Sequence, residues 1–528
     1  MNGEEVISLY SNLEREKQDA ASWASELKKF VYPFSPTGLP SSFSFLGVGL
    51  KNLHDSTAVR ANQRLAAAHQ SFLSDPGKLW FSFEPSAALG SAVQKSGPVK
   101  KWLRDCAERT YQALAESNFY TVNHQALLDR CGFGTGSYYG GISNENRLMF
   151  AYVPFDSFVF AEDEQGMPNL LIRKFEWNAV QAARWLGGAG KLNQPMKDAY
   201  RDETERIKKK FTILHAVGRK ENYDPLTEKE YFSFYVEKGN KDVLEEGGFD
   251  EFPYMVSRFL KWVGPWGLAP ARLCWSNILS LQYSRRITRT LGELKAFPRL
   301  KISKDLVGRV SLRPGGQTVV SQADAGLPAE WSTVGDYREV MNEMEMDRQE
   351  VRSAFYLDML DLFGAQTGQM TATEVNARLE ERLLAFSPTF CQHLNDFRPM
   401  MLRIFRLMLD ARLFDTNVPS ELMRPNGKGG QEFNPKALPD VVYNSKFAQL
   451  MKQVQLSGLV GSQDIIANMA KFDPGVIARF NFDFAAQEVV RGMGVPESFI
   501  RNDNEKKEAL QEMQERMMAQ PPAGGDNN

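Results

Sequence analysis

Apolar residues near the N-terminus recur at helical spacing between many charged ones. Their pattern predicts an amphipathic helix over residues 6–30, which Pro33 and Pro36 end. The apolar face consists of Leu9, Leu13, Trp23, Leu27 and Phe30. A glycine-, serine- and phenylalanine-rich loop over residues 40–50 follows.

A second helix, rich in alanine, is predicted from about residue 56 to 73. Asp55 or Ser56 can cap it by accepting a backbone N–H bond, and Pro76 ends it. Residues 79–83 have the composition of a strand, because aromatic residues dominate them. Two further helices are predicted over residues 98–117 and 121–131.

The pattern changes to short strand-like runs between residues 133 and 262. Glycine, asparagine, proline and aspartate turn signals separate these runs, and one helix over about 178–187 interrupts them. The predicted strands cover residues 148–152, 157–161, 170–175, 211–217 and 231–236. This pattern predicts an α+β domain built on an antiparallel sheet.

Two long helical stretches follow the break at Gly264–Gly267, over residues 271–294 and 334–360. The segment between them contains several prolines and glycines, with strand-like pieces at 300–302 and 317–320. A loop of this length within a compact domain is usually functional. We therefore expect a small excursion domain between the two helices.

A glycine-punctuated break at 361–368 precedes another long helix over residues 371–412, expected to bend at Pro388 and Pro399. A proline- and glycine-rich link (414–440) leads to a helical segment over 443–471. A short helix (504–518) precedes a tail that we expect to be disordered.

The composition favours an ordinary multidomain globular protein. The chain has 528 residues, too many for one hydrophobic core, with 43% hydrophobic and 24% charged residues. Its net charge is −2. Proteins that hold nucleic acid by its phosphates usually carry a basic excess, so any contact with DNA should be loose or indirect.

The four cysteines, Cys106, Cys131, Cys274 and Cys391, are too far apart for a C-x-x-C pair. We expect reduced, buried thiols, with no disulfide framework and no metal site. The N-terminus lacks the pattern of a signal peptide, and no apolar run is long enough to span a bilayer. These features predict a protein of a cytosol-like space that has no membrane partner.

No motif in the sequence indicates catalysis or a cofactor. The run at 187–192 approaches a phosphate-binding loop, but Trp185 replaces its first glycine and Leu192 its magnesium-binding hydroxyl. We expect a helix-ending loop there. The glycine-rich run at 134–140 has the wrong spacing for a dinucleotide site and leads into strand. The five histidines form no H-x-x-x-H pair and are expected to be structural.

The helix predicted at 334–360 carries an acidic stripe at intervals of three and four residues. Its members are Asp336, Glu339, Glu343, Asp347 and Glu350. At about 3.6 residues per turn they share one side of the helix. The stripe could be an ordinary solvated face, could line a channel that repels DNA, or could pair with Arg285, Arg286 and Arg289 of the preceding helix.

Several segments together resemble the portal proteins of podovirus type, the head-to-tail connectors of short-tailed phages. The first is the helix opened by Asp55-Ser56-Thr57-Ala58, which is followed by Trp80-Phe81. The second is Thr371-Ala372-Thr373-Glu374-Val375 before a long helix. Val442-Tyr443 and Gly492–Pro496 also fit. One departure is Trp266-Gly267-Leu268, where the family often has a tyrosine-glycine-arginine run.

The resemblance implies a ring, usually of twelve subunits, at one capsid vertex. Its parts would be a wing (1–270), first stem helix (271–293), clip (294–333), second stem helix (334–360), tunnel loop (361–370), long wing helix and link (371–440), crown (441–503), and C-terminal helix and tail (504–528). The acidic stripe would line the DNA channel. Gly364, Gln366, Thr367 and Gly368 would form the moving loop.

The resemblance further implies a non-enzymatic virion protein without cofactors, assembled in the host cytoplasm. Its partners would be the terminase large subunit, a tail adaptor, the major capsid and scaffolding proteins, internal core proteins, and double-stranded DNA in transit. Two other hypotheses remain open from the residues alone: another structural virion protein of the tail or internal core, and an α+β enzyme of unrecognised mechanism.

Overall fold

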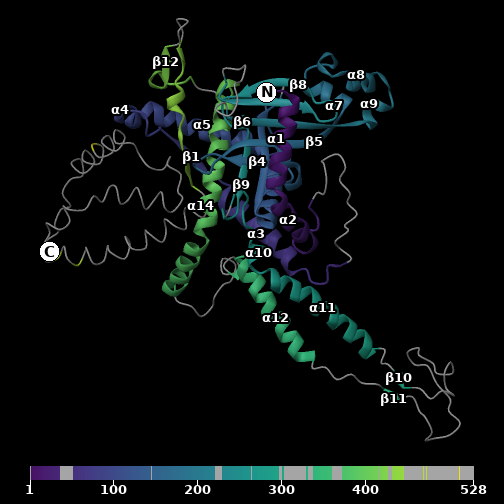
Figure 1. Cartoon of the computed structure of the whole chain (residues 1–528). Helices are drawn as coiled ribbons and strands as arrows, with labels where there is room; N and C mark the ends of the chain where they lie inside the picture. Colours follow the sequence, from purple (N-terminus) through teal and green to yellow (C-terminus); the bar gives the residue numbers. More distant parts are fainter. Residues whose placement is uncertain are drawn as a thin grey trace, which may run out of the picture.

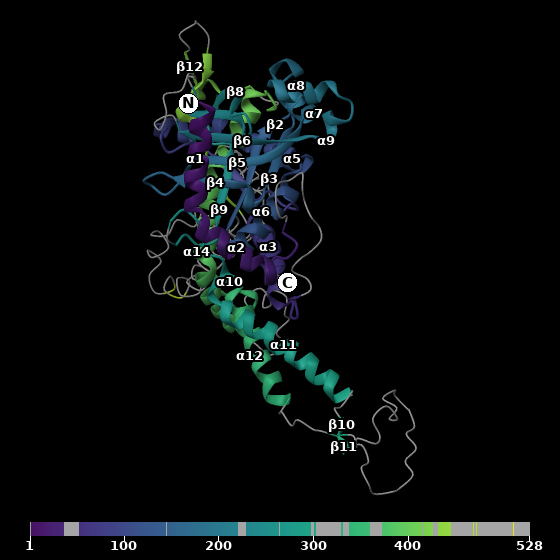
Figure 2. The same cartoon turned by 45° about the vertical axis from the view of Figure 1, so that its right-hand side comes forward.

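The computed structural model describes residues 2–35, 52–143, 145–219, 229–262, 264–296, 300–301, 329–330, 337–358, 372–414, 417–425, 431–444, and the single residues 468, 471 and 511. They form a mixed α/β body from which two helices project (Figure 1). A view turned by 45° shows the same projection, at the end of the body opposite to β12 and α8 (Figure 2).

Thirteen α-helices lie in the described part of the chain. They are α1 (Gly3–Glu16), α2 (Gln18–Phe30), α3 (Thr57–Leu73), α4 (Ser91–Lys95), α5 (Gly97–Glu116), α6 (Phe119–Phe133), α7 (Ala179–Trp185), α8 (Gln194–Arg201), α9 (Glu205–Lys208), α10 (Pro270–Leu273), α11 (Trp275–Ala296), α12 (Tyr337–Ala354) and α14 (Ala372–Asp410).

The described strands are all antiparallel to their neighbours. They are β1 (Phe81–Glu84), β2 (Thr135–Ile142), β3 (Leu148–Val153), β4 (Phe158–Glu162), β5 (Pro168–Asn178), β6 (Lys210–Arg219), β7 (Tyr231–Glu237), β8 (Asp242–Phe249), β9 (Tyr254–Arg258), β10 (Leu300–Lys301), β11 (Ala329–Glu330), β12 (Met423–Pro425), β13 (Gln431–Phe433) and β14 (Asp440–Tyr443).

The centre of the body is a five-stranded sheet in the order β4-β5-β6-β7-β8, packed near a three-stranded sheet in the order β3-β2-β9. Side chains alternate between the two faces of a strand. Helix α1 covers one face through Val6, Tyr10 and Leu13. The three-stranded sheet and the helices α7 and α8 share the other face. The predicted α+β class is therefore confirmed.

Helix α14 closes a second core, next to the β1–β14 pair. Phe397, Met401 and Phe405 of α14 pack with Trp80 and Phe81 in this core. Both predicted bend points, Pro388 and Pro399, lie inside the continuous helix α14. A helix of this length can carry internal prolines when packing on its neighbours offsets the lost hydrogen bonds.

The N-terminal helix predicted over residues 6–30 is two helices, α1 and α2, which meet at Lys17. Lys17 is only 4% exposed, and its ammonium donates hydrogen bonds to the carbonyls of Phe155 and Phe158. The ammonium also lies 4.8 Å from the ring centre of Trp266. The sequence pattern could not reveal this break, because the groups that bind Lys17 come from a distant loop.

The burial of Lys17 predicts a pH dependence of stability. Desolvation lowers the pKa of Lys17 to about 7, although nearby carboxylates oppose this. The unfolded chain therefore binds this proton more tightly than the folded chain does between pH ~7 and ~10. The unfolding free energy of the unsubstituted protein, minus that of the Lys17→Met variant, should therefore increase as pH rises through this window.

Urea unfolding at several pH values tests this prediction. Lys29→Met serves as the control, since Lys29 lies on α2 with its side chain 49% exposed. A stability difference for Lys17→Met that stays constant or falls between pH 7 and 10 would contradict the assignment.

Other expected elements need correction. The predicted helix at 271–294 is α10 and α11, with Cys274 between them. Strands β8 and β9, helices α8 and α9, and strands β12 and β13 were not predicted. The helix expected over 443–471 does not begin at Tyr443, which belongs to β14. The remainder of that prediction, apart from single residues, and the helix and tail predicted over 504–528 lie outside the described residues.

A buried ion pair joins α14 to the three-stranded sheet. Asp396 accepts hydrogen bonds from the Arg258 guanidinium (2.7 Å) and from the Arg258 backbone N–H (2.8 Å). The two side chains are 1% and 0% exposed. Glu162 pairs with the same guanidinium, so the charge of Arg258 is neutralised from two sides. Such a pair fixes how α14 sits on the sheet.

Two glycines permit a close backbone approach beside this ion pair. Gly134 ends α6 with φ +95°, and a Cβ there would overlap the backbone of Gly267. A Cβ on Gly267 would in turn overlap the Gly134 carbonyl. The Gly267 N–H donates to the Thr135 hydroxyl at 2.9 Å. The glycine of the Trp266-Gly267-Leu268 segment is thus needed for packing.

Candidate functional site

The two projecting helices, α11 and α12, form an antiparallel hairpin, which we call the helical hairpin. Leu281 and Ile278 of α11 and Met344 and Val351 of α12 are buried in one core with parts of α2 and α3. The Thr288 hydroxyl lies 3.6 Å from the Met344 sulfur. The base of the hairpin is therefore anchored in the body, and its far end extends away from it (Figure 1).

The acidic stripe lies on one lateral side of α12. Glu343 and Glu350 each precede a buried residue, Met344 and Val351, by one position. One residue turns a helix by about 100°. Their carboxylates are therefore about a quarter turn away from α11, and they are exposed, as is Glu339. Asp336 lies outside the described residues.

Asp347 differs from the other members of the stripe. Its Oδ1 accepts a hydrogen bond from Asn277 of α11 at 2.9 Å. Its Oδ2 is buried and has no hydrogen-bond partner in the described part of the chain. Asp347 therefore lies at the seam between the two helices, at the edge of the exposed acidic surface.

The arginines of α11 do not neutralise the stripe within the described residues. No ion pair there joins Arg285, Arg286 or Arg289 to an acidic residue of α12; the described pairs of α12 are Arg348–Asp55, Arg348–Glu345 and Arg352–Asp358. Arg285 and Arg289 each follow a buried residue of α11 by one position. In an antiparallel pair this places them on the side opposite to the stripe.

The junction between the hairpin and the body is built on Asp55. Gln282 of α11 accepts from the backbone N–H groups of His54 (2.7 Å) and Asp55 (3.0 Å), and donates to the Asp55 carbonyl (2.8 Å). Arg348 of α12 donates to the Asp55 carboxylate at 3.1 Å. Both helices of the hairpin therefore form hydrogen bonds with Asp55, which lies two residues before the start of α3.

Asp55 also caps α3, as the sequence allowed. Its Oδ1 accepts from the Thr57 N–H at 2.8 Å, whereas the Ser56 side chain makes no capping bond. Burial alone would raise the pKa of Asp55, but the bonds from Thr57 and Arg348 outweigh it and lower the pKa. The Asp55-Ser56-Thr57 motif thus has a structural role at the base of the hairpin.

Replacing Asp55 should weaken this junction. The Asp55→Ala variant loses the cap and leaves Arg348 without its buried partner, so we expect a loss of about 2 kcal/mol in unfolding free energy. Ser56→Ala is the matched control and should change it by less than about 0.5 kcal/mol. Urea unfolding compares the two; equal effects of the two substitutions would contradict this account.

The other motif residues divide into two groups. Trp80 is 2% exposed and stacks with Phe119 and Tyr443, while Phe81 pairs with Tyr443 across the β1–β14 ladder. The Trp80-Phe81 and Val442-Tyr443 segments are therefore neighbours in the fold. Thr371, Gly364, Gln366, Thr367 and Gly368 lie outside the described residues, as do the side chains of Ala372 and Glu374, whose backbone opens α14.

The segments considered for catalysis have structural explanations. The run at 187–192 ends α7, with the Gly188 N–H bonded to the Ala183 carbonyl. His69, His215 and His393 are buried, and burial lowers the pKa of each well below its usual value. Each contacts a polar partner: Arg130, Tyr254 and Ser257 respectively.

The cysteine prediction was wrong at one position. Cys106, Cys131 and Cys274 are free and buried, but Cys391 on α14 is exposed. In the described ranges, no three histidine, cysteine, aspartate or glutamate side chains gather closely enough to hold a metal ion. No described helix is long and apolar enough to cross a membrane.

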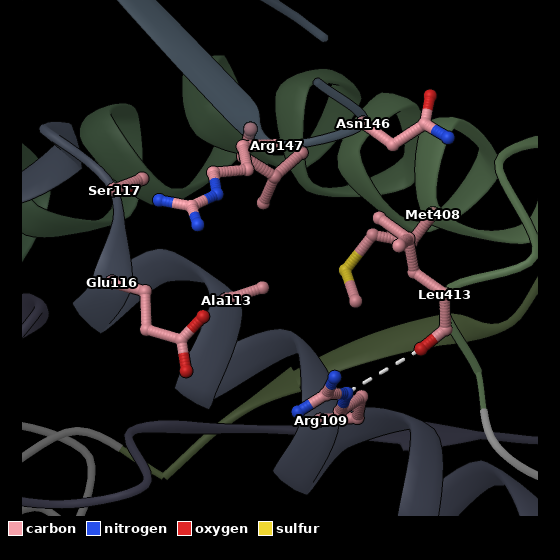
Figure 3. Close-up of a pocket in the computed structure, with 9 residues that line it drawn as sticks. Arg109, Ala113, Glu116, Ser117, Asn146, Arg147, Met408 and Leu413 are labelled. Carbon is pink, nitrogen blue, oxygen red and sulfur yellow. Dashed lines mark hydrogen bonds between the residues drawn. The ribbon is translucent and has the colours of Figure 1, made fainter. Parts of the chain in front are cut away.

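A surface pocket that the sequence did not predict lies between α5, β3 and the end of α14 (Figure 3). Met408 and Ala113 contribute apolar surface to its lining, and Arg109 and Arg147 line it as well. The Arg109 Nε donates to the Leu413 carbonyl at 3.4 Å, so this guanidinium is partly engaged. The lining contains a carboxylate, Glu116, but no nucleophile paired with a base.

Comparison with known proteins identifies the class. Residues 3–500 match the family described as "Bacteriophage head to tail connecting protein", and the chain belongs to this family. It is 23% identical over 516 residues to the "Probable portal protein" of Bordetella phage BPP-1, covering 95% of this chain and 89% of that protein. It is also 23% identical over 517 residues to the "Portal protein" of Salmonella phage epsilon15, covering 94% and 88% respectively.

Proposed function

We propose that the chain is a portal subunit. A ring of these subunits at one capsid vertex forms the channel through which viral DNA is packaged and ejected. The observation that carries this proposal is the family match over residues 3–500, together with two relatives that are described as portal proteins and align along nearly their whole length.

The order of structural elements supports the assignment of each segment of the chain to one part of a portal subunit. The body (1–270, with the long helix and link at 371–440) is the wing, and the helical hairpin is the stem. The excursion at 294–333 is the clip, and 361–370 is the tunnel loop. The pairing of β14 with β1 keeps residues 441–443 in the wing, so the crown begins after this strand and extends to residue 503, followed by the C-terminal segment at 504–528. A body with one projecting hairpin suits a ring whose channel the hairpins surround.

The partners of such a ring follow from its position. The clip binds the terminase large subunit during packaging and a tail adaptor afterwards. The wing and crown contact the major capsid, scaffolding and internal core proteins. The subunit is assembled in the host cytoplasm, remains in the virion, and performs no covalent chemistry.

The acidic side of the hairpin faces the channel in this proposal. Glu339, Glu343 and Glu350 are exposed and point away from the Asp55 junction, which lies on the opposite side of the hairpin. In a ring of about a dozen copies, these carboxylates form a wall of like charge around the DNA. Such a wall repels phosphates and offers few attachment points, so DNA can slide.

Reversing this charge should slow packaging without preventing ring assembly. The Glu339→Lys, Glu343→Lys double variant gives the passing phosphates cations to bind, so we expect a packaging rate several-fold lower at low salt, recovering as salt rises. Asp347 is left unchanged because its bond to Asn277 supports the hairpin.

A matched variant with the same change in net charge is Glu108→Lys, Glu116→Lys, on the exposed side of α5 in the body. It should package at the unsubstituted rate. DNA packaging into purified proheads measures both. An equal rate for the α12 variant and the unsubstituted protein would show that the stripe does not line the channel.

A further inference from the structure

Two exposed apolar side chains mark opposite edges of the helical hairpin. On α11, Tyr283 is 68% exposed and follows the buried Leu281 by two residues. On α12, Met346 is 68% exposed and follows the buried Met344 by two residues. Two residues turn a helix by about 200°, so Met346 points away from α11. Tyr283 also comes one residue before the buried Ser284, so it lies on the part of the α11 edge that is nearest the acidic side of the hairpin. The hairpin presents one such residue at each outer edge.

The two edges lie at the same level along the hairpin. Two contacts fix the level: Asn277 with Asp347, and Thr288 with Met344. Tyr283 lies between Asn277 and Thr288 in α11, and Met346 lies between Met344 and Asp347 in α12. Subunits of a ring are related by rotation about its axis, which leaves the height of each residue along that axis unchanged. Where the hairpin runs along the ring axis, Tyr283 of one copy can therefore meet Met346 of the next.

The charges beside these residues are complementary. Helix α11 carries four basic residues and one acidic residue, whereas α12 carries five acidic and three basic residues. On the α11 edge, Arg286 is exposed one turn after Tyr283; on the α12 edge, Glu345 is 60% exposed beside Met346. Leu279, 40% exposed, extends the apolar part of the α11 edge.

We propose that the α11 edge of one subunit packs against the α12 edge of the next, with Tyr283 on Met346 and Arg286 facing the carboxylate side. This assignment rests on the proposed ring and names the surfaces that close it. The contact is head-to-tail, because two different edges meet, and such contacts generate rings when the rotation closes. An aromatic ring against a thioether is a favourable contact of about 0.3–1.5 kcal/mol.

The same arrangement is compatible with a channel lined by acidic residues. Glu343 and Glu350 lie between the α11 side of α12 and its outer edge. With neighbouring hairpins side by side around the ring, this lateral side faces either the channel or the exterior. Arg285 and Arg289 occupy the opposite lateral side, so the two kinds of charge are kept apart.

Cross-linking of the full-length chain tests the proposed contact. Tyr283→Cys and Met346→Cys are combined in a Cys391→Ser background, because the three remaining cysteines are buried. Within one chain the two positions point apart, so a short bis-maleimide can join them only between chains. We expect a ladder of covalent oligomers on a denaturing gel, rising to the size of the ring, and no ladder from either single variant.

Two results would overturn the assignment. Assembled rings of the double variant that stay monomeric on the gel would show that these edges do not meet. Covalent dimers from Tyr283→Cys alone would show a two-fold contact instead. Failure of the unsubstituted protein to form rings is a separate result, visible by electron microscopy before any cross-linking, and it would count against the proposed function itself.

A second readout uses conservative removal of the apolar contact. Tyr283→Ser and Met346→Ser should each raise the protein concentration at half-maximal ring assembly by about tenfold. Ile207→Ser is the matched control, since Ile207 on α9 is 61% exposed but lies at the other end of the body. Unchanged assembly of both hairpin variants in mass photometry would contradict the contact.

Discussion

Replacing Gly134 by alanine is expected to prevent the body from folding. Gly134 has φ +95°, where side chains are strained, and its Cβ would overlap the Gly267 backbone, which cannot move aside like a flexible side chain. Either α6 or the segment before α10 would have to shift, so we expect a loss of more than about 4 kcal/mol.

Soluble yield and the midpoint of thermal unfolding measure this effect. Gly190→Ala is the matched control, because a Cβ at Gly190 meets no atom within 4 Å. The control should express and unfold like the unsubstituted protein. A soluble Gly134→Ala protein with an unchanged midpoint would contradict the backbone packing described for α6.

Removing the Asp396 carboxylate should have the next largest effect. The Asp396→Ala substitution removes one of the two carboxylates that pair with the Arg258 guanidinium. It also removes the acceptor for the Arg258 backbone N–H. A buried charge that loses its partner costs about 3–5 kcal/mol. Because this pair fixes α14 on the three-stranded sheet, the loss should appear in unfolding of the whole body.

Urea unfolding of the two single variants compares Asp396→Ala with Asp410→Ala on the same helix. The Asp410 side chain is 66% exposed and lies 4.0 Å from Arg406, so its removal should cost less than about 1 kcal/mol. Equal losses of unfolding free energy at the two positions would mean that the Arg258–Asp396 pair stabilises the fold no more than a surface ion pair does.

Local patterns predicted most of the long elements. Strands β3 to β7 follow from alternating apolar residues between turn signals, and α3, α5, α6, α11, α12 and α14 follow from helical periodicity. Elements decided by distant partners were missed. The α1–α2 break depends on carbonyls near Phe155, and β14 forms because residues 440–443 meet β1. Such partners leave no local pattern.

The same limit applies to the candidate site. Spacing alone indicated that the acidic residues share one side of α12, and Glu339, Glu343 and Glu350 are indeed exposed. Spacing could not indicate that Asp347 accepts a hydrogen bond from Asn277, nor that Gln282 and Arg348 donate hydrogen bonds to Asp55. These contacts join segments far apart in the chain, so no local pattern contains them.

Electron microscopy of the purified protein tests most directly whether this chain forms a ring with a channel. Class averages viewed along the particle axis should show rings with a central hole and a symmetry of about twelvefold. Compact particles without a hole would contradict the proposed function and, with it, the assignment of the two hairpin edges.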